Sequence, residues 1–206
     1  MTQGQLFLIS APSGAGKTSL VNAALEKDPR LVVSVSHTTR DQRGGEQDAV
    51  EYHFTDRNTF EQMIRAGDFL EHADVFGNYY GTAISEVEKK QADGKDVILE
   101  IDWQGAEQVR SQRPDATSIF ILPPSIASLE ERLTSRGQDS AESMQRRLSE
   151  ARLDMSKAVD FDFLVINEDF ETALEQLLAV FTSARLTTSY QRRRSEIRQL
   201  IDGTAR

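Results

Sequence analysis

The sequence predicts an α/β fold, a parallel β-sheet with helices on both of its faces. Short apolar runs alternate along the chain with segments of helical periodicity, and such runs are typical of strands buried inside a parallel sheet. A glycine-rich turn joins the first apolar run to the first helix. Residues 37–82 interrupt the alternation, and their short alternating segments predict an inserted, small β-rich lobe.

The elements of the first half follow from apolar runs and from the residues that interrupt them. "QLFLIS" is a continuous apolar run, and the helix after it stops before Pro29, because the residue that precedes a proline avoids the helical region. Gly67 ends a second helix, within the lobe. The expected elements are a strand at 5–10, a helix at 17–27, a strand at 31–36, a short strand at 50–54, a helix at 57–67 and a tight aromatic turn at 76–81.

The second half resumes the alternation of strands and helices. "DVILEID" and "TSIFIL" are apolar runs of the kind that parallel sheets bury, and two prolines after the second run introduce another helix. The expected elements are helices at 83–94, 104–112, 126–137 and 141–159, strands at 96–102, 117–125 and 161–167, and a long C-terminal helix.

Composition excludes several classes of function. The 206 residues include no cysteine, which rules out disulfides, thiolate metal sites and cysteine nucleophiles. A net charge of −9 opposes general binding to the phosphate backbone of nucleic acids. No apolar stretch approaches the roughly 18–20 residues that span a bilayer, and the N-terminus lacks the basic region of a signal peptide. We therefore expect a cytoplasmic protein that binds neither nucleic acid nor membranes.

Residues 10–19, "SAPSGAGKTS", match most of the phosphate-loop motif G-x-x-x-x-G-K-S/T. Gly16, Lys17 and Thr18 supply the end of the motif, between a strand and a helix as the motif requires. We expect Lys17 to reach the β- and γ-phosphates of a nucleotide and Thr18 to coordinate Mg²⁺. Ala11 replaces the first glycine, which the loop tolerates if the φ of Ala11 is negative. The parallel sheet is therefore expected to be of the P-loop NTPase type.

Two acidic residues close the apolar run at 96–102. Glu100 and Asp102 are two positions apart, so both point to one face of the expected strand. Ligands of open α/β sheets bind at the carboxyl ends of the strands, beside the phosphate loop. One or both acids are candidates to hold Mg²⁺ through water or to bind substrate. The alternative is that Asp102 only caps the helix that begins near Trp103.

Five further segments indicate which group accepts the phosphoryl. "SVSHTTRDQRGGE", "VEYHF", "FLEHADVFGNYYGT", "LEIDWQG" and "ILPPS" together resemble the guanylate kinase family, over nearly the whole chain from about residue 4 to about residue 180. The pairing of "TTRDQRGGE" with "GNYYGT" is specific, since most P-loop families carry neither segment. The resemblance implies transfer of the γ-phosphoryl group of ATP to GMP, with Mg²⁺ as the cofactor.

The chemistry of the lobe agrees with this resemblance. Arginine forks and tyrosine hydroxyls suit a phosphate, and a carboxylate meets the adjacent N1–H and amino donors of guanine. By resemblance, Glu71 in "FLEHA" reads the guanine, while Ser36 and Thr82 contact the region of its O6. The residues expected to bind GMP or dGMP are Ser36, Arg40, Arg43, Tyr52, Glu71, Tyr80, Thr82, Glu100 and Asp102.

The resemblance also assigns the ATP side. "EERLTSRG" and "QRRLSEAR" resemble the helical lid of the family, at about residues 132–150, and Asn167 in "VINED" matches the position that contacts adenine. The residues expected to bind ATP are Ser13, Gly14, Ala15, Gly16, Lys17, Thr18, Ser19 and Asn167, and those expected to act in catalysis are Lys17, Arg40, Arg132, Arg136 and Arg147. The core domain would comprise residues 1–36 and 83–206, and the GMP-binding lobe residues 37–82.

Two other functions are open to a chain with a phosphate loop. A related kinase with a different acceptor, such as a ribosyl bisphosphate kinase, would lack "GNYYGT" and the guanine-reading acid. A guanylate-kinase-like binding module without activity would have lost the phosphate loop, whereas Lys17 and Thr18 are present here. The tail at 182–206 combines apolar residues with a basic run, and we expect a solvated helix there, with assembly into a homo-oligomer as the alternative.

Overall fold

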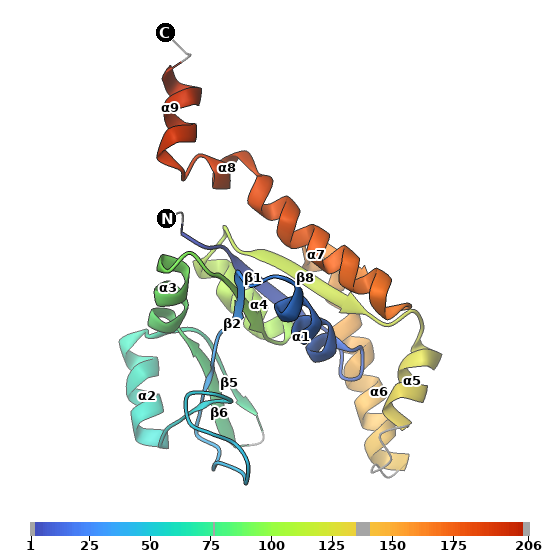
Figure 1. The fold of residues 1–206 in the computed structure, drawn as a ribbon. Coiled ribbons are helices and arrows are strands. Elements are labelled where there is room, and N and C mark those ends of the chain that lie inside the picture. Colours follow the sequence, from blue (N-terminus) through green and yellow to red (C-terminus); the bar gives the residue numbers. More distant parts are fainter. Residues whose placement is uncertain (1–2, 76, 135–140, 204–206) are drawn as a thin grey trace.

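The computed structural model describes residues 3–75, 77–134 and 141–203 and confirms the α/β fold (Figure 1). Its main sheet has five strands, and every neighbouring pair is parallel. β1 occupies the centre, so the turn that follows it opens at the middle of the carboxyl edge of the sheet. The strand order is β2 (Leu31–Val33), β7 (Asp96–Glu100), β1 (Leu6–Ser10), β8 (Thr117–Leu122) and β9 (Phe163–Ile166).

Helices cover both faces of this sheet, as predicted. They are α1 (Lys17–Lys27) and α7 (Phe170–Leu186) on one face and α3 (Ile84–Ala92) and α4 (Trp103–Gln112) on the other. Because successive side chains of β1 point to opposite faces, Phe7 and Ile9 pack under α1 and α7 while Leu6 and Leu8 pack under α3 and α4. The rings of Phe7 and Phe181 meet edge-on, with centroids 4.7 Å apart.

Residues between β2 and α3 form a second sheet of four strands. Its order is β4 (His53–Phe54), β3 (His37–Thr38), β6 (Asn78–Ala83) and β5 (Phe69–Val75). Phe60, from α2 (Arg57–Ala66), stacks on Phe69 with ring centroids 4.5 Å apart. Asp56 caps the start of α2, and Gly67 ends it with a φ of 75°, as predicted.

Several predicted segments differ from the structure. The strand predicted at 50–54 covers only His53–Phe54, and the strand predicted at 117–125 ends at Leu122. The tight aromatic turn at 76–81 is wrong for most of its length, because Asn78–Ala83 pair with β5 as the antiparallel strand β6. The turn lies before that strand, where the N–H of Gly77 donates to Asp74 Oδ1 at 2.8 Å. The strand predicted at 31–36 stops at Val33, since the chain crosses to the second sheet before His37, and the strand predicted at 161–167 covers only Phe163–Ile166.

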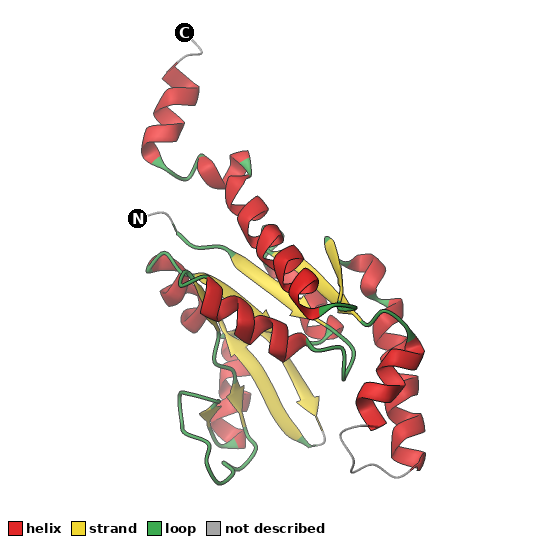
Figure 2. Ribbon diagram, turned by 45° about the vertical axis from the view of Figure 1, so that its right-hand side comes forward, coloured by secondary structure: helices red, strands yellow, loops and turns green. Residues whose placement is uncertain are grey.

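Two helices follow β8 at one edge of the molecule. α5 (Ile126–Thr134) and α6 (Ala141–Ser156) pack together through Leu129, Leu133, Leu148 and Ala151. Figures 1 and 2 both show the two helices side by side. A turn of 3-10 helix, η1 (Ala158–Asp160), follows α6 and leads into β9. These helices occupy the segment in which the lid is predicted.

The C-terminal helix is broken rather than continuous. α7 ends because Thr187 takes an extended backbone conformation, and its side chain caps a new short helix, α8 (Thr188–Gln191). α9 (Ser195–Gly203) then stands away from the body of the molecule, and none of its residues is buried (Figures 1 and 2). Among the described helices, none is both long and apolar enough to cross a membrane.

A buried ion cluster joins the end of α7 to the amino-terminal edge of the main sheet. Arg185, which is 5% exposed, donates through Nε to Asp96 and through Nη1 to Asp28, at 2.5 Å in both cases. The second oxygen of Asp96 accepts from the backbone N–H of Gln5 at 2.7 Å. The cluster therefore connects α7 to β1, to β7 and to the turn between α1 and β2.

We expect Arg185→Met to lower the free energy of unfolding by about 3–5 kcal/mol, because it leaves the Asp96 carboxylate buried without its cation. Urea denaturation followed by circular dichroism measures the change. Arg193→Met is the matched control, since the ion pair of Arg193 with Asp115 is partly exposed and such pairs contribute less than about 1 kcal/mol. Equal losses of unfolding free energy in the two variants would show that the buried cluster stabilises the fold no more than an exposed ion pair does.

Candidate active site

The turn between β1 and α1 has the conformation of a phosphate-binding loop. Gly14 and Gly16 have φ of 89° and 95°, values that residues with a side chain rarely adopt. Among the described residues other than glycine, Ala49 is the one with a positive φ, so Ala11 satisfies the condition set by its sequence. No side chain caps α1, and the first N–H groups of a helix lack partners inside it, which suits an anion at this end.

The two glycines of the loop also make room for their neighbours. A Cβ on Gly14 would lie 2.8 Å from Cδ2 of Leu133, on α5, and a Cβ on Gly16 would lie 2.4 Å from Nδ2 of Asn167. Both distances are too short for non-bonded atoms, so a side chain at either position would require the Leu133 or the Asn167 side chain to shift. Close packing and the positive φ therefore both favour glycine at each position.

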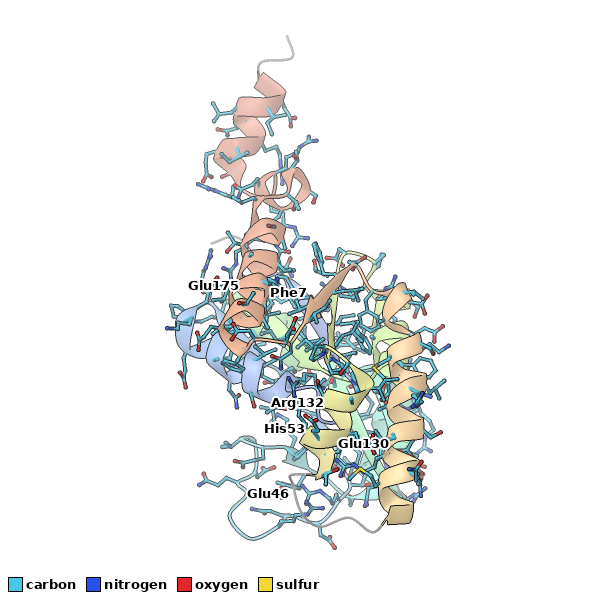
Figure 3. The ribbon with its side chains drawn as sticks, turned by 90° about the vertical axis from the view of Figure 1, so that its right-hand side faces the viewer. Phe7, Glu46, His53, Glu130, Arg132 and Glu175 are labelled. Atoms are coloured by element: carbon cyan, nitrogen blue, oxygen red, sulfur yellow. The ribbon has the colours of Figure 1, made fainter. Side chains whose placement is uncertain are left out.

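Predicted ATP-site residues from distant parts of the chain meet at this loop. Asn167 Nδ2 donates to the carbonyl of Ala15 at 2.7 Å, and Arg132 Nη2 donates to the carbonyl of Asn167 at 2.8 Å. Figure 3 shows Arg132 on α5. Arg147, on α6, donates to Ser13 Oγ at 3.1 Å. Two of the three predicted lid arginines therefore contact the loop or its partner, and Arg136 lies outside the described residues.

Lys17 and Thr18, at the start of α1, face the end of β7. Thr18 Oγ1 donates to Glu100 Oε2 at 3.0 Å. Burial lowers the pKa of Lys17, and the nearby charges of Glu100 and Asp102 oppose that change. Asp102 caps α4 by accepting from the N–H of Gly105 at 2.7 Å, as the alternative for this residue foresees. Glu100 is therefore the acid in contact with the predicted magnesium ligand.

The structure brings together the three residues predicted to read guanine. Glu71, on β5, is 7% exposed and accepts from Thr82 Oγ1 at 2.6 Å, while Ser36 Oγ lies 3.5 Å from the same hydroxyl. Burial raises the pKa of Glu71, the hydrogen bond from Thr82 lowers it, and the charge of Asp102 raises it further. The result is a buried acid held in place by a hydroxyl group, beside the start of α4.

The predicted phosphate-binding residues of the lobe form a second group. Cζ of Arg40 lies 5.5 Å from the centre of the Tyr52 ring, and the ring centres of Tyr52 and Tyr80 are 5.8 Å apart. The sequence interpretation gave no role to Glu46, which accepts from Arg40 Nη2 at 2.7 Å and from the backbone N–H of Arg43 at 2.8 Å. An acid within a loop that carries two arginines is the signal that could have indicated this role.

One cavity connects the phosphate loop to the second sheet. It measures about 320 Å³ and is lined by Lys17, Thr18, Val33, Ser34, Ser36, Glu51, Tyr52, Thr82, Leu99 and Glu100. Six of these residues belong to the predicted site, whereas Val33, Ser34, Glu51 and Leu99 do not. The cavity therefore has a phosphate loop at one end and the hydroxyl groups of the lobe at the other, as two substrates that react with each other require.

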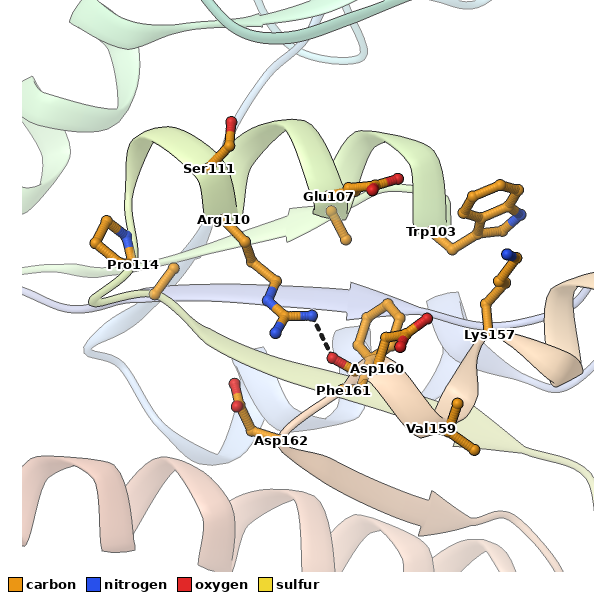
Figure 4. Close-up of a pocket in the computed structure, with 12 residues that line it drawn as sticks. Trp103, Glu107, Arg110, Ser111, Pro114, Lys157, Val159, Asp160, Phe161 and Asp162 are labelled. Carbon is orange, nitrogen blue, oxygen red and sulfur yellow. Dashed lines mark hydrogen bonds between the residues drawn. The ribbon is translucent and has the colours of Figure 1, made fainter.

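A second cavity, of about 710 Å³, lies between α4 and the connection from α6 to β9, and no predicted site residue lines it (Figure 4). Lys157 Nζ lies 4.6 Å from the centre of the Trp103 ring, and Arg110 donates to the carbonyl of Asp160. These contacts hold the base of α6 and the turn after it against α4. The walls of this cavity thus anchor the second lid helix to the core.

A phosphate loop at the carboxyl end of the central strand, with an acid-containing lobe opposite it, defines a P-loop phosphotransferase. The model of the guanylate kinase family matches residues 3–184, and the chain belongs to this family.

Two relatives and one solved structure extend this match. The guanylate kinase of Hahella chejuensis is 60% identical over 196 residues, which cover 95% of this chain and 94% of the relative. The guanylate kinase of Thiobacillus denitrificans is 53% identical over 191 residues, covering 93% and 91%. The crystal structure of the guanylate kinase from Anaplasma phagocytophilum has a TM-score of 0.75 and 31% identity, and the match covers 97% of this chain and 96% of that one.

We expect Glu71→Gln to stabilise the ligand-free protein at neutral pH. Burial raises the pKa of Glu71 in the folded chain. Between the ordinary and the raised pKa, the Glu71 carboxyl group is therefore protonated in the folded chain and ionised in the unfolded chain. The contribution of Glu71 to the free energy of unfolding is therefore greatest below its ordinary pKa and falls as pH rises towards the raised value. The variant lacks this fall, and a gain of about 1 kcal/mol raises the Tm of a chain of this size by about 2–4 °C.

Calorimetric melting at about pH 4 and about pH 8 measures this difference in both proteins. Glu88→Gln is the control, because Glu88 is an exposed acid on α3. A lower Tm for Glu71→Gln than for the unaltered protein at neutral pH would mean that the carboxylate stabilises the fold.

Proposed function

We propose that the protein is a nucleoside monophosphate kinase that transfers the γ-phosphoryl group of ATP to GMP and releases ADP and GDP. One observation carries the proposal: a cavity extends from Lys17 and Thr18 at the phosphate loop to Tyr52 and Thr82 of the second sheet. A donor phosphate at the first end and an acceptor phosphate at the second would share this space. Membership of the guanylate kinase family supports both substrates.

GMP or dGMP is proposed to bind in the lobe. The carboxylate of Glu71 can accept two parallel hydrogen bonds from the N1–H and the amino group of guanine, while Ser36 and Thr82 contact the region of O6. Adenine offers no such donor pair, so the buried acid would lose its partners. The residues proposed to hold the acceptor phosphate are Arg40, Arg43, Tyr52 and Tyr80.

ATP is proposed to bind along residues 13–19, with Asn167 near the base. The Thr18 hydroxyl and the Glu100 carboxylate, 3.0 Å apart, supply the oxygen ligands that Mg²⁺ prefers, with Glu100 acting through water and Asp102 as the second candidate. Such an ion usually completes its coordination with water and substrate phosphates. When bound, Mg²⁺ neutralises charge on the β- and γ-phosphates.

The transfer itself is proposed to depend on alignment and charge neutralisation, without a covalent intermediate. Lys17, Arg132, Arg136 and Arg147 would offset charge on the γ-phosphoryl group, and Arg40 would hold the acceptor in line. The acceptor oxygen of GMP is already anionic, so no general base is needed. The lobe at 37–82 and the lid at about 132–150 would close on the core, at 1–36 and 83–206, because exclusion of water protects ATP from hydrolysis.

The alternatives are less well supported. A kinase for a different acceptor would not need the contact between Thr82 of "GNYYGT" and Glu71. A binding module would not need Lys17 or the contact between Thr18 and Glu100. We place the enzyme in the cytoplasm, with nucleotides as its partners and no membrane partner. A net charge of −9 disfavours nucleic acids as partners.

An assay of ADP release tests the proposed reaction. GMP and dGMP should be accepted in the presence of magnesium and ATP, and AMP should be slower by roughly 10⁴-fold, because sites that hydrogen-bond a substrate reject analogues without the donors. Lys17→Ala should lower kcat by about 10²–10³-fold or more, as does the loss of other charge-stabilising donors, and should leave the fold intact by circular dichroism.

Three results would contradict the proposal. The first is ADP release that does not depend on GMP, and the second is near-normal turnover by Lys17→Ala. The third concerns Glu71→Gln, for which we expect weaker binding of GMP and unchanged binding of ATP. Equal weakening of the two nucleotides would show that Glu71 does not read the acceptor base.

We also propose that α9 mediates assembly into a homo-oligomer. Its side chains Leu200 and Ile201 are 65% and 42% exposed, on a helix that stands away from the body of the molecule. Truncation after Arg194 keeps the buried Arg185 cluster and should reduce the molar mass measured by light scattering to that of one chain. If the truncated protein keeps the same number of chains per particle as the full chain, α9 is not the contact.

A further inference from the structure

Asn167 makes contacts that a residue serving only the adenine base does not require. It follows β9 and is 5% exposed, and its backbone N–H donates to the carbonyl of Leu122 at 2.8 Å. Its Nδ2 donates to the carbonyl of Ala15 at 2.7 Å. This partner fixes the orientation of the side-chain amide, because a carbonyl oxygen accepts a hydrogen bond from the amide nitrogen and not from the amide oxygen.

Arg132 reinforces the same contact from the lid. Its Nη2 donates to the carbonyl of Asn167 at 2.8 Å, and its Nη1 lies 3.4 Å from the carbonyl of Ala15. The next residue, Gly16, has no room for a Cβ beside Asn167. The carbonyl of Ala15 is therefore held by donors from α5 and from the end of β9, with the Asn167 amide closely packed against the following residue.

The direction of this carbonyl determines the direction of a neighbouring N–H. The peptide bond between Ala15 and Gly16 is trans, and the C=O and N–H of a planar trans peptide point in opposite directions. With the Ala15 carbonyl directed at Asn167, the N–H of Gly16 points away from Asn167. Backbone N–H groups of a phosphate loop are the groups that bind the phosphates.

We propose that Asn167 is a positioning residue of the phosphate loop, whose amide holds the Ala15 carbonyl so that the N–H of Gly16 faces the phosphate before the nucleotide arrives. The proposal rests on the proposed ATP site and goes beyond the adenine contact that family resemblance implies. Its physical benefit is preorganisation, because a donor that already has its bound orientation needs no rearrangement when the anion binds.

Inorganic tripolyphosphate separates the two roles, since it has a phosphate chain and no base. Asn167→Leu keeps the size of the side chain and removes its amide without adding charge. Calorimetric titration should show that the Kd rises about tenfold for magnesium-bound ATP and for tripolyphosphate alike. That change corresponds to about 1.4 kcal/mol, close to the net value of one hydrogen bond. Asn22→Leu, at an exposed position of α1, should change neither Kd.

Kinetics with ATP and ITP, whose bases differ at the amino group, provide a second readout. Asn167→Leu should lower kcat/KM for both donors, including ITP, which lacks the adenine amino group. A Tm close to that of Asn22→Leu shows that the fold is intact. The proposal is overturned if Asn167→Leu raises the Kd of ATP but not that of tripolyphosphate, or if it raises neither. It is also overturned if the unaltered protein does not bind tripolyphosphate. Absence of phosphoryl transfer in the unaltered protein would instead contradict the proposed function, and the titrations would still test Asn167.

Discussion

The backbone turn after β1 is the constraint on which the rest of the site depends. Gly14 and Gly16 both have φ near 90°, and the space that their side chains would occupy is taken by Leu133 and Asn167. The positions that bend the loop are therefore also the positions on which α5 and the end of β9 rest. A side chain at Gly14 would meet Leu133 of α5, and one at Gly16 would meet the Asn167 amide, so the loop packs closely against both elements.

The acceptor side depends on an arrangement that reduces stability. Burial of Glu71 raises its pKa, and the hydrogen bond from Thr82 offsets only part of that effect. An uncharged residue would suit the interior better, but the guanine contact that we propose for Glu71 needs an acceptor. Such a conflict between local stability and side-chain chemistry is typical of functional sites. Apolar burial on both faces of β1 holds the carboxyl edge of the sheet in place around this arrangement.

Features with a local cause could be predicted from the sequence, and those that depend on distant pairing could not. The helix predicted at 17–27 coincides with α1. Its two ends are set by residues directly beside it in the chain, the glycines before it and the Asp28-Pro29 pair after it. β6 was missed because its tyrosines and glycine form a strand only by pairing with β5 and β3, which lie elsewhere in the chain. Likewise, the motif indicates Thr18, but its contact with Glu100 depends on the pairing of β1 with β7. Glu46 ends the recognised segment "TTRDQRGGE", but its contact with Arg40 exists only once the loop has folded.

Arg40, which we propose to hold the acceptor phosphate, illustrates how an acidic protein could bind nucleotides. Arg40 donates to Glu46 and to the carbonyl of Asp41, and its guanidinium lies over Tyr52, so the side chain is oriented before a substrate binds. Ordering a long side chain at the moment of binding costs about 0.5–1.5 kcal/mol, and here the folded loop has already met that cost. With a net charge of −9, the overall field of the protein repels polyanions. Binding must therefore come from short-range contacts with cations fixed in place, which is why the partners of Arg40 matter more than the total charge.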